Sequence, residues 1–208
     1  MKIGIVGSGH IGGTLTRRLQ ALGHDVTVTN SRGPQSLTDL ATETGATAGT
    51  LEEAVQGAEL VVVAIPLKAV PDLPPALFDG KLVVDADNYY PERDGDIPEL
   101  LDRSLSSSRW TADHLKGARV VKAFNNIQAA YLMDSGKPAG TPDRIGLPVA
   151  GDDAEAKRVV MELVDELGFD PVDAGTLDES WRQQPGAPVY GTDRGADGVR
   201  QGLAEARP

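Results

Sequence analysis

The chain has 208 residues, of which 40% are hydrophobic and 25% are charged, and these values exclude a disordered or fibrous protein. Its formal net charge of −11 argues against non-specific binding to nucleic acid or to an anionic membrane, because both would repel it. Cysteine is absent, which rules out disulfides, thiol catalysis and thiolate metal ligands, and the 3 histidines are too scattered to suggest a metal site.

Short apolar runs rich in valine and isoleucine recur along the chain, as expected of strands buried on both faces of a sheet. They are Lys2–Val6, Val26–Thr29, Leu60–Ile65, Leu82–Asp85, Val120–Ala123 and Leu147–Ala150. Between them lie segments with apolar residues at helical spacing, namely Ile11–Leu22, Leu37–Thr44, Leu51–Val55 and Asp153–Leu167. This alternation predicts βαβ units and a doubly wound α/β fold with a mostly parallel sheet.

Two segments depart from the alternation. Residues 88–108 are polar and contain two prolines, which predicts a surface excursion with one helical turn. After Asp173 the sequence is loop-like, yet it contains Trp181 and Tyr190, which a disordered tail would rarely carry. We therefore expect residues 175–208 to pack on the domain or on a second subunit.

The first strand is followed by a glycine-rich loop that opens the first helix. Residues 7–12 read Gly-Ser-Gly-His-Ile-Gly, which is the pattern G-x-G-x-x-G. Gly7 permits a tight turn, Gly9 lets a pyrophosphate approach the backbone, and Gly12 lets the helix lie close to the sheet. The helix N-terminus offers free N–H groups and a partial positive charge to the phosphates. Strand, loop, helix and second strand follow in this order, so the segment predicts a Rossmann dinucleotide-binding fold.

The end of the second strand indicates which dinucleotide binds. An NAD-binding chain places an acid about 20 residues after the glycine loop, where it accepts hydrogen bonds from the ribose. Here the sequence has Asn30, Ser31 and Arg32, which can donate hydrogen bonds to a phosphate. An aspartate would repel the 2′-phosphate of NADP, so these residues favour NADP(H). The alternative is a turn whose arginine points into water.

Ligands of doubly wound folds lie beyond the carboxyl ends of the strands. Three predicted strands end there with residues able to contact the nicotinamide half of the cofactor: Ala64, Ile65, Pro66, Asn88, Asn125 and Asn126. The asparagine amides suit a carboxamide or a planar heterocycle, although a lone Asn88 is also a common turn or cap residue. Lys122 is either a catalytic cation or the partner of Asp85 or Asp87. A site of amides and backbone suits hydride transfer between planar cofactors, which needs positioning more than proton transfer.

Three segments resemble the deazaflavin (coenzyme F420)-dependent NADP reductases, in the same order along the chain: residues 3–33, "VVKAFNNI" at 120–127, and residues 148–175. The resemblance spans residues 1–190. It implies that Ser8, His10 and Ile11 line the pyrophosphate, that Asn30, Ser31 and Arg32 hold the 2′-phosphate, and that Ile65 and Pro66 border the nicotinamide. It also implies hydride transfer between nicotinamide C4 and deazaflavin C5. Better-known reductases of this family tend to carry His-Thr where this chain has Asn125 and Asn126.

We therefore predict a single dinucleotide-binding domain over residues 1–208, with its core at 1–174 and a C-terminal tail at 175–208. The predicted activity is an NADP(H)-dependent oxidoreductase that exchanges hydride with F420 or a flavin-like acceptor, with Asn125 and Asn126 as the catalytic candidates and no metal. The alternatives are a reductase of a small imine, ketone or free flavin, and a non-catalytic NADPH-binding sensor. We expect a cytoplasmic homodimer without nucleic-acid or membrane partners, since no signal peptide precedes the first strand.

Overall fold

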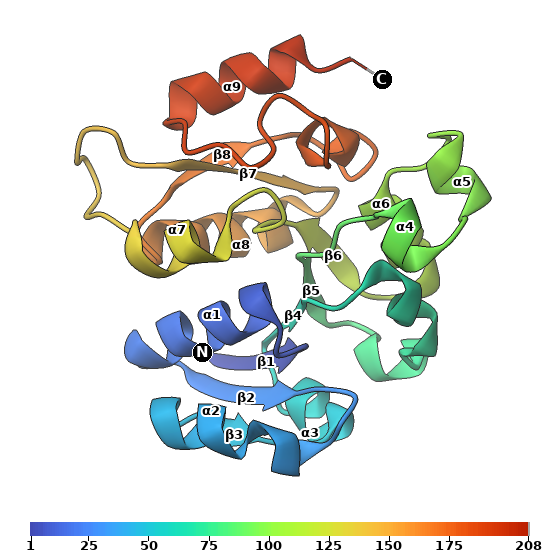
Figure 1. Ribbon diagram of the computed structural model, residues 1–208, viewed down its shortest axis with the longest axis vertical. Helices are drawn as coiled ribbons and strands as arrows, with labels where there is room; N and C mark the ends of the chain where they lie inside the picture. The colour runs from blue at the N-terminus through green and yellow to red at the C-terminus, as the bar shows by residue number, and fades with distance from the viewer. Residues whose placement is uncertain (208) are drawn as a thin grey trace.

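A computed structural model describes residues 1–207. Its centre is an eight-stranded sheet with the strand order β3-β2-β1-β4-β5-β6-β7-β8. The strands are β1 (Lys2–Val6), β2 (Asp25–Thr29), β3 (Thr47–Ala48), β4 (Leu60–Val63), β5 (Leu82–Asp85), β6 (Arg119–Lys122), β7 (Gly146–Gly151) and β8 (Asp170–Asp173). All adjacent pairs are parallel except β6 and β7, so the sheet reverses direction there (Figure 1).

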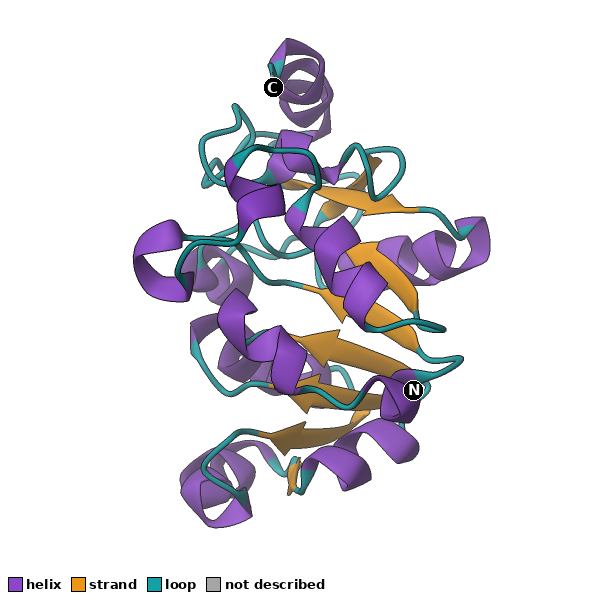
Figure 2. Ribbon diagram, turned by 90° about the vertical axis from the view of Figure 1, so that its right-hand side faces the viewer, coloured by secondary structure: helices purple, strands orange, loops and turns teal. Residues whose placement is uncertain are grey.

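Helices cover both faces of the sheet (Figure 2). They are α1 (His10–Ala21), α2 (Thr38–Thr44), α3 (Leu51–Gln56), α4 (Pro91–Asp94), α5 (Pro98–Leu101), α6 (Ser107–His114), α7 (Ala129–Asp134), α8 (Ala154–Glu166) and α9 (Ala196–Glu205). Four 3₁₀ turns complete the list: η1 (Pro34–Leu37), η2 (Leu67–Asp72), η3 (Pro75–Phe78) and η4 (Ser180–Gln183).

Alternate residues of the central strands supply two separate cores. On one face, Ile5 and Val62 are buried with Leu15 of α1 and Leu163 of α8. On the other face, a second cluster includes Val61 of β4, with residues of α3, η3 and α6. Burial of both faces explains why these strands are continuous apolar runs in the sequence.

The predicted fold class is confirmed. Each of the six predicted strands is present within two residues of its predicted bounds, and all four predicted helices form. The α3 helix begins at a capping box in which Thr50 accepts from the Glu53 N–H and the Glu53 side chain accepts from the Thr50 N–H. Asp153 caps α8 by accepting from the N–H groups of Glu155 and Ala156.

Other elements differ from the sequence-based expectation. Residues 88–108 were expected to form a surface excursion with one turn, but they form α4, α5 and the start of α6, and Ser106–Ser108 are buried. Residues 174–195 were expected to be loop-like, and apart from the 3₁₀ turn η4 they are, but the ten-residue helix α9 that follows was not predicted. Val199 and Leu203 of α9 are buried against Val172 of β8, because the reversed strands β7 and β8 leave an apolar face that needs cover.

Candidate active site

The glycine loop has the geometry that its sequence predicts. Gly7 adopts a positive φ of 109°, and a Cβ at this position would lie 2.1 Å from the Ala64 carbonyl oxygen. A Cβ on Gly12 would lie 1.9 Å from the Gly7 oxygen, so only glycine lets α1 approach the loop this closely. By contrast, a Cβ on Gly9 would meet no atom of residues 1–207 within 4 Å. The loop is therefore closed on its protein side and open above Gly9.

Gly9 also occupies the N-cap position of α1, and no side chain caps this helix. The first turn contains no acidic residue that would repel an anion. His10 beside it is exposed and Ile11 is half-buried. The N-terminus of α1 therefore presents uncapped N–H groups beside an open surface, which suits a phosphate.

The turn after β2 is organised by the Asn30 side chain. Its Nδ2 donates to Ser8 Oγ at 2.9 Å, and its Oδ1 accepts from the Arg32 N–H at 2.9 Å and from Ser36 Oγ at 3.0 Å. Ser31 and Arg32 are exposed, and the Arg32 guanidinium makes no hydrogen bond or ion pair with residues 1–207. The structure thus ties the turn to the glycine loop through Asn30 and leaves Ser31 and Arg32 available to a ligand.

The end of β4 lies beside the glycine loop. The Ala64 N–H donates to the Val6 oxygen at 2.8 Å, and the Ile65 N–H donates to Asp87 Oδ1 at 2.7 Å. Pro66 is exposed and starts the turn into η2. Residues 64–66 are therefore held between β1 and the end of β5, which is where the sequence places the nicotinamide half of a dinucleotide.

A buried polar cluster lies at the ends of β5 and β6. The Lys122 ammonium donates to Asp85 Oδ2 at 3.2 Å, and both side chains have 0% exposure. Ser108 Oγ donates to the same oxygen at 2.6 Å. Of the two roles considered for Lys122, the structure confirms the ion pair. Lys122 also donates to the main-chain oxygen of Asp87, so it links the two strand ends.

Among the charged side chains of this cluster, Asp87 has the fewest hydrogen-bond and ion-pair partners. It is 3% exposed, and its Oδ2 has no hydrogen-bond partner within residues 1–207. Burial, together with the negative charge of Asp85, raises the pKa of the Asp87 carboxyl well above its usual range. This buried carboxyl accepts the Ile65 N–H, so it lies directly beside the chain after β4.

The asparagines predicted as catalytic bind the C-terminal segment. Asn125 Nδ2 donates to the Gln183 oxygen at 2.7 Å and to Asn88 Oδ1 at 3.0 Å, while Asn125 Oδ1 accepts from Gln183 Nε2 at 3.0 Å. Asn88 Nδ2 donates to the Asn125 oxygen at 2.8 Å. The main-chain oxygen of Asn126 accepts from the Gly191 N–H at 2.7 Å, and the Asn126 Nδ2 donates to the Val189 main-chain oxygen at 3.4 Å. The amides of Asn88 and Asn125 are thus brought together, but as parts of a buried hydrogen-bonded network.

Sequence reasoning missed a tyrosine pair at the rim of this network. The hydroxyls of Tyr90 and Tyr190 hydrogen-bond to each other, and the Arg93 guanidinium lies 4.9 Å from the centroid of the Tyr90 ring. Burial and the Tyr90 hydroxyl both raise the pKa of Tyr190. The pair joins residues 88–97 to the C-terminal segment, 100 residues later in the chain. No local sequence pattern indicates a contact between residues so far apart.

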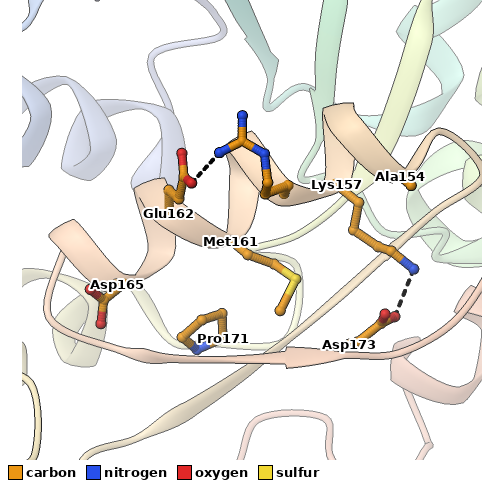
Figure 3. Close-up of a pocket in the computed structure, with 8 residues that line it drawn as sticks. Ala154, Lys157, Met161, Glu162, Asp165, Pro171 and Asp173 are labelled. Carbon is orange, nitrogen blue, oxygen red and sulfur yellow. Dashed lines mark hydrogen bonds and ion pairs between the residues drawn. The ribbon is translucent and has the colours of Figure 1, made fainter.

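A separate hollow of about 470 Å³ lies between α8 and β8, and it contains none of the predicted site residues. Figure 3 shows Met161 between the helix and the strand near Pro171, and the Lys157–Asp173 ion pair, 2.7 Å long, at one end. Within residues 1–207, no group of three or more acidic or histidine side chains is placed to hold a metal ion. No helix of this part of the chain is long and apolar enough to cross a bilayer.

Comparison with known proteins agrees with this geometry. Residues 2–89 match the family described as NADP oxidoreductase, coenzyme F420-dependent. A hypothetical protein of Sinorhizobium meliloti has a similar structure, with 34% identity, a TM-score of 0.78, and coverage of 92% of this chain and 93% of that one. A candidate F420-dependent NADP reductase of Arthrobacter sp. FB24 has 29% identity and a TM-score of 0.73, covering 88% and 87%.

The N-terminal part of the chain, residues 2–89, thus matches the coenzyme F420-dependent NADP oxidoreductase family, and the chain as a whole has the fold of the Arthrobacter protein. The matched range of this family's description includes the glycine loop, Arg32 and residues 64–66. It ends at Tyr89, before Asn125, Asn126 and the C-terminal segment. The family description therefore covers the glycine loop and the ends of β2 and β4, and it does not extend to the asparagines after β6.

A longer protein similar to this chain is the metalloreductase STEAP3 of Rattus norvegicus, which is 33% identical over 179 residues. The match covers 85% of this chain and 34% of the relative, so the chain spans about a third of the metalloreductase. A reductive aminase of Aspergillus terreus shares the fold, with a TM-score of 0.61 at 19% identity over 85% of this chain and 56% of that one.

Proposed function

We propose that the protein binds NADP(H) across the glycine loop and transfers hydride between nicotinamide C4 and a deazaflavin or flavin-like acceptor. The observation that carries the proposal is the unpaired Arg32 at the end of β2, beside an open helix N-terminus, in a member of an NADP oxidoreductase family. Under this proposal the uncapped N–H groups of α1 bind the pyrophosphate, with Ser8, His10 and Ile11 lining it.

The 2′-phosphate is bound by Ser31 and Arg32. A guanidinium presents a planar fork of donors that suits phosphate oxygens, and the exposed hydroxyl of Ser31 adds another donor. Asn30 contributes indirectly, since its Oδ1 already accepts two hydrogen bonds and its Nδ2 holds Ser8. We therefore assign Asn30 the task of fixing the turn in the conformation that aims Arg32 at the ligand.

The nicotinamide lies against Ala64, Ile65 and Pro66. Hydride transfer between two planar rings needs close contact and the exclusion of water more than a side-chain acid or base. In our proposal Asn88, Asn125 and Asn126 shape the wall of the acceptor side by holding the C-terminal segment in place. The acceptor then lies between this segment and the nicotinamide.

Titration of the protein with NADPH and with NADH tests the nucleotide assignment. We expect Arg32→Ala to raise the NADPH dissociation constant by roughly 10- to 100-fold and to leave that for NADH unchanged, because a charged hydrogen bond to the phosphate is lost. Arg200→Ala is the matched control, since Arg200 is an exposed arginine on α9 and pairs only with Asp197. Equal NADPH affinity for the wild type and Arg32→Ala would show that the assignment of Arg32 is wrong.

Anaerobic mixing of the protein with NADPH and F420 tests the acceptor. We expect the deazaflavin absorbance to bleach as the ring is reduced, and no change at stoichiometric protein would reject the deazaflavin. A panel of free flavin, cyclic imine, ketone and ferric citrate then separates the alternatives, the last because one relative is named a metalloreductase. Tight NADPH binding without turnover on any acceptor would instead indicate a sensor.

We also propose that the protein is a cytoplasmic homodimer with no nucleic-acid or membrane partner. Leu22, Tyr131 and Met133 are exposed near the junction of α1 and α7, where Arg18 Nη1 donates to the Met133 oxygen at 2.6 Å. Exposed apolar side chains of this size favour association. Light scattering at micromolar concentration checks the assembly, and a particle of 21.9 kDa would refute it.

A further inference from the structure

The carboxyl group of Asp87 is buried behind the proposed nicotinamide site without a cation of its own. Its Oδ1 accepts the Ile65 N–H at 2.7 Å, and its Oδ2 is buried with no partner in the part of the chain that the structure describes. A buried carboxylate normally pairs with a cation or accepts several hydrogen bonds. A neutral carboxylic acid satisfies this environment better than a carboxylate does.

The charged groups around Asp87 come from each element packed against it. Lys122 on β6 bonds to Asp85 Oδ2 and to the Asp87 main-chain oxygen, so its one positive charge is balanced by Asp85. On α4, Arg93 pairs with Asp94 at 2.8 Å. Ser108 on α6 donates to Asp85, and the segment after β4 donates the Ile65 N–H to Asp87. The cluster is electrically neutral when Asp87 carries its proton.

The proposed function places the nicotinamide against Ile65, one hydrogen bond away from this acid. The two cofactor states differ there by one charge, since the ring of NADPH is neutral and that of NADP⁺ is positive. Their ribose, adenine and phosphate groups are the same. A positive charge beside a buried carboxyl favours its ionised form.

We propose that Asp87 is a positioning residue whose charge follows that of the nicotinamide, so that it is a neutral acid with NADPH and a carboxylate with NADP⁺. On NADP⁺ binding the O–H bond of the carboxyl breaks, the electron pair stays on Oδ2, and the proton leaves to bulk water. During turnover the hydride carries two electrons from C4 to the acceptor, the ring gains a positive charge, and Asp87 loses its proton. The net charge of the buried site then stays constant.

This inference rests on the proposed function and predicts a thermodynamic difference between the two ligands. NADP⁺ binding releases up to one proton more than NADPH binding, and its affinity rises by up to about tenfold per pH unit over the titration range. Protons exchanged by the ligand phosphates are common to both ligands. They therefore cancel in the comparison.

Isothermal titration calorimetry in buffers of different ionisation enthalpy measures the protons released, between pH 5.5 and 8.5. We expect the wild type to release more protons with NADP⁺ than with NADPH, and Asp87→Asn to bind both ligands without this difference. The Asn side chain keeps an acceptor for the Ile65 N–H and mimics the neutral acid. Asp96→Asn, which removes an exposed carboxylate beyond α4, is the matched control and should keep the difference.

A second measurement applies to the wild-type protein alone. With ¹³Cγ-labelled aspartate, NMR should show one buried carboxyl that is protonated in the NADPH complex and ionised in the NADP⁺ complex at the same pH. Equal proton release with both ligands, or a difference that survives in Asp87→Asn, would overturn the inference while leaving the proposed function intact. Failure of both ligands to bind would overturn the proposed function and this inference with it.

Discussion

Replacing Lys122 with methionine should destabilise the protein strongly, because it leaves Asp85 charged and buried. Lys122 and Asp85 are both fully buried, 3.2 Å apart. Removing one partner of such a pair costs about 3–5 kcal/mol. Asp85 keeps its hydrogen bonds from Ser108 Oγ at 2.6 Å and from the Asp87 N–H at 2.9 Å, so we expect the lower end, about 3 kcal/mol. For a chain of this size that lowers Tm by roughly 6–12 °C.

Urea unfolding followed by the fluorescence of Trp110 and Trp181 measures the change. Lys116→Met, which alters an exposed lysine before β6, is the matched control and should change the free energy of unfolding by less than about 0.5 kcal/mol. The double variant Asp85→Asn with Lys122→Met removes both charges and should recover most of the loss.

Two results decide this test. A loss below 1 kcal/mol for Lys122→Met, or a double variant as unstable as the single one, would refute the idea that this pair neutralises the strand ends.

Three further predictions concern the glycines, Asp87 and Asn125. Gly9→Ala should unfold at the same urea concentration as the wild type but bind NADPH more weakly. Gly12→Ala should lower the free energy of unfolding, because its Cβ would lie 1.9 Å from the Gly7 oxygen. Equal stability of the two variants would contradict this difference. Because the pKa of Asp87 is raised on folding, the stability it contributes is lost as pH rises from its unfolded value through the folded one, by at most about 1.4 kcal/mol per pH unit. The urea midpoint should therefore fall more between pH 5 and 9 for the wild type than for Asp87→Asn. Parallel pH curves for the two proteins would contradict a raised pKa of Asp87. Asn125→Ala should increase amide hydrogen exchange in residues 183–191 while NADPH affinity changes by less than threefold, and unchanged exchange would disprove the anchoring role.

The parts of the fold that sequence predicted are those determined by local pattern and burial. The strands β1 and β5 are continuous apolar runs, which only a sheet buried on both faces explains. The glycine loop was predictable because Gly7 and Gly12 lie where no Cβ fits, a steric requirement that the local spacing indicates. The helix α9 was missed because its apolar residues Val199 and Leu203 are few and are separated by glycines that weaken a helix.

The candidate site was less predictable because its partners are distant in sequence. Arg32 could be placed by counting from the glycine loop, but nothing local shows that Asn30 holds Ser8 across 22 positions. The Asn125 and Asn126 amides were predicted as catalytic from their position at a strand end, and this role stays a prediction. The bonds from these amides to the main-chain oxygens of Gln183 and Val189 depend on where α8, β8 and the following segment return, which composition does not encode.

The two consecutive asparagines after β6 hold the two ends of one short stretch of chain. The Asn125 side chain donates to the Gln183 oxygen, and the Asn126 main-chain oxygen accepts from the Gly191 N–H. Between these points the stretch has further contacts with the domain, since Val189 is buried in a core cluster with Val172 and the Tyr190 hydroxyl bonds to that of Tyr90. Under the proposed function the stretch borders the acceptor, so exchanging only residues 185–188 between relatives, with Gln184, Val189 and Tyr190 kept, tests whether it determines acceptor preference.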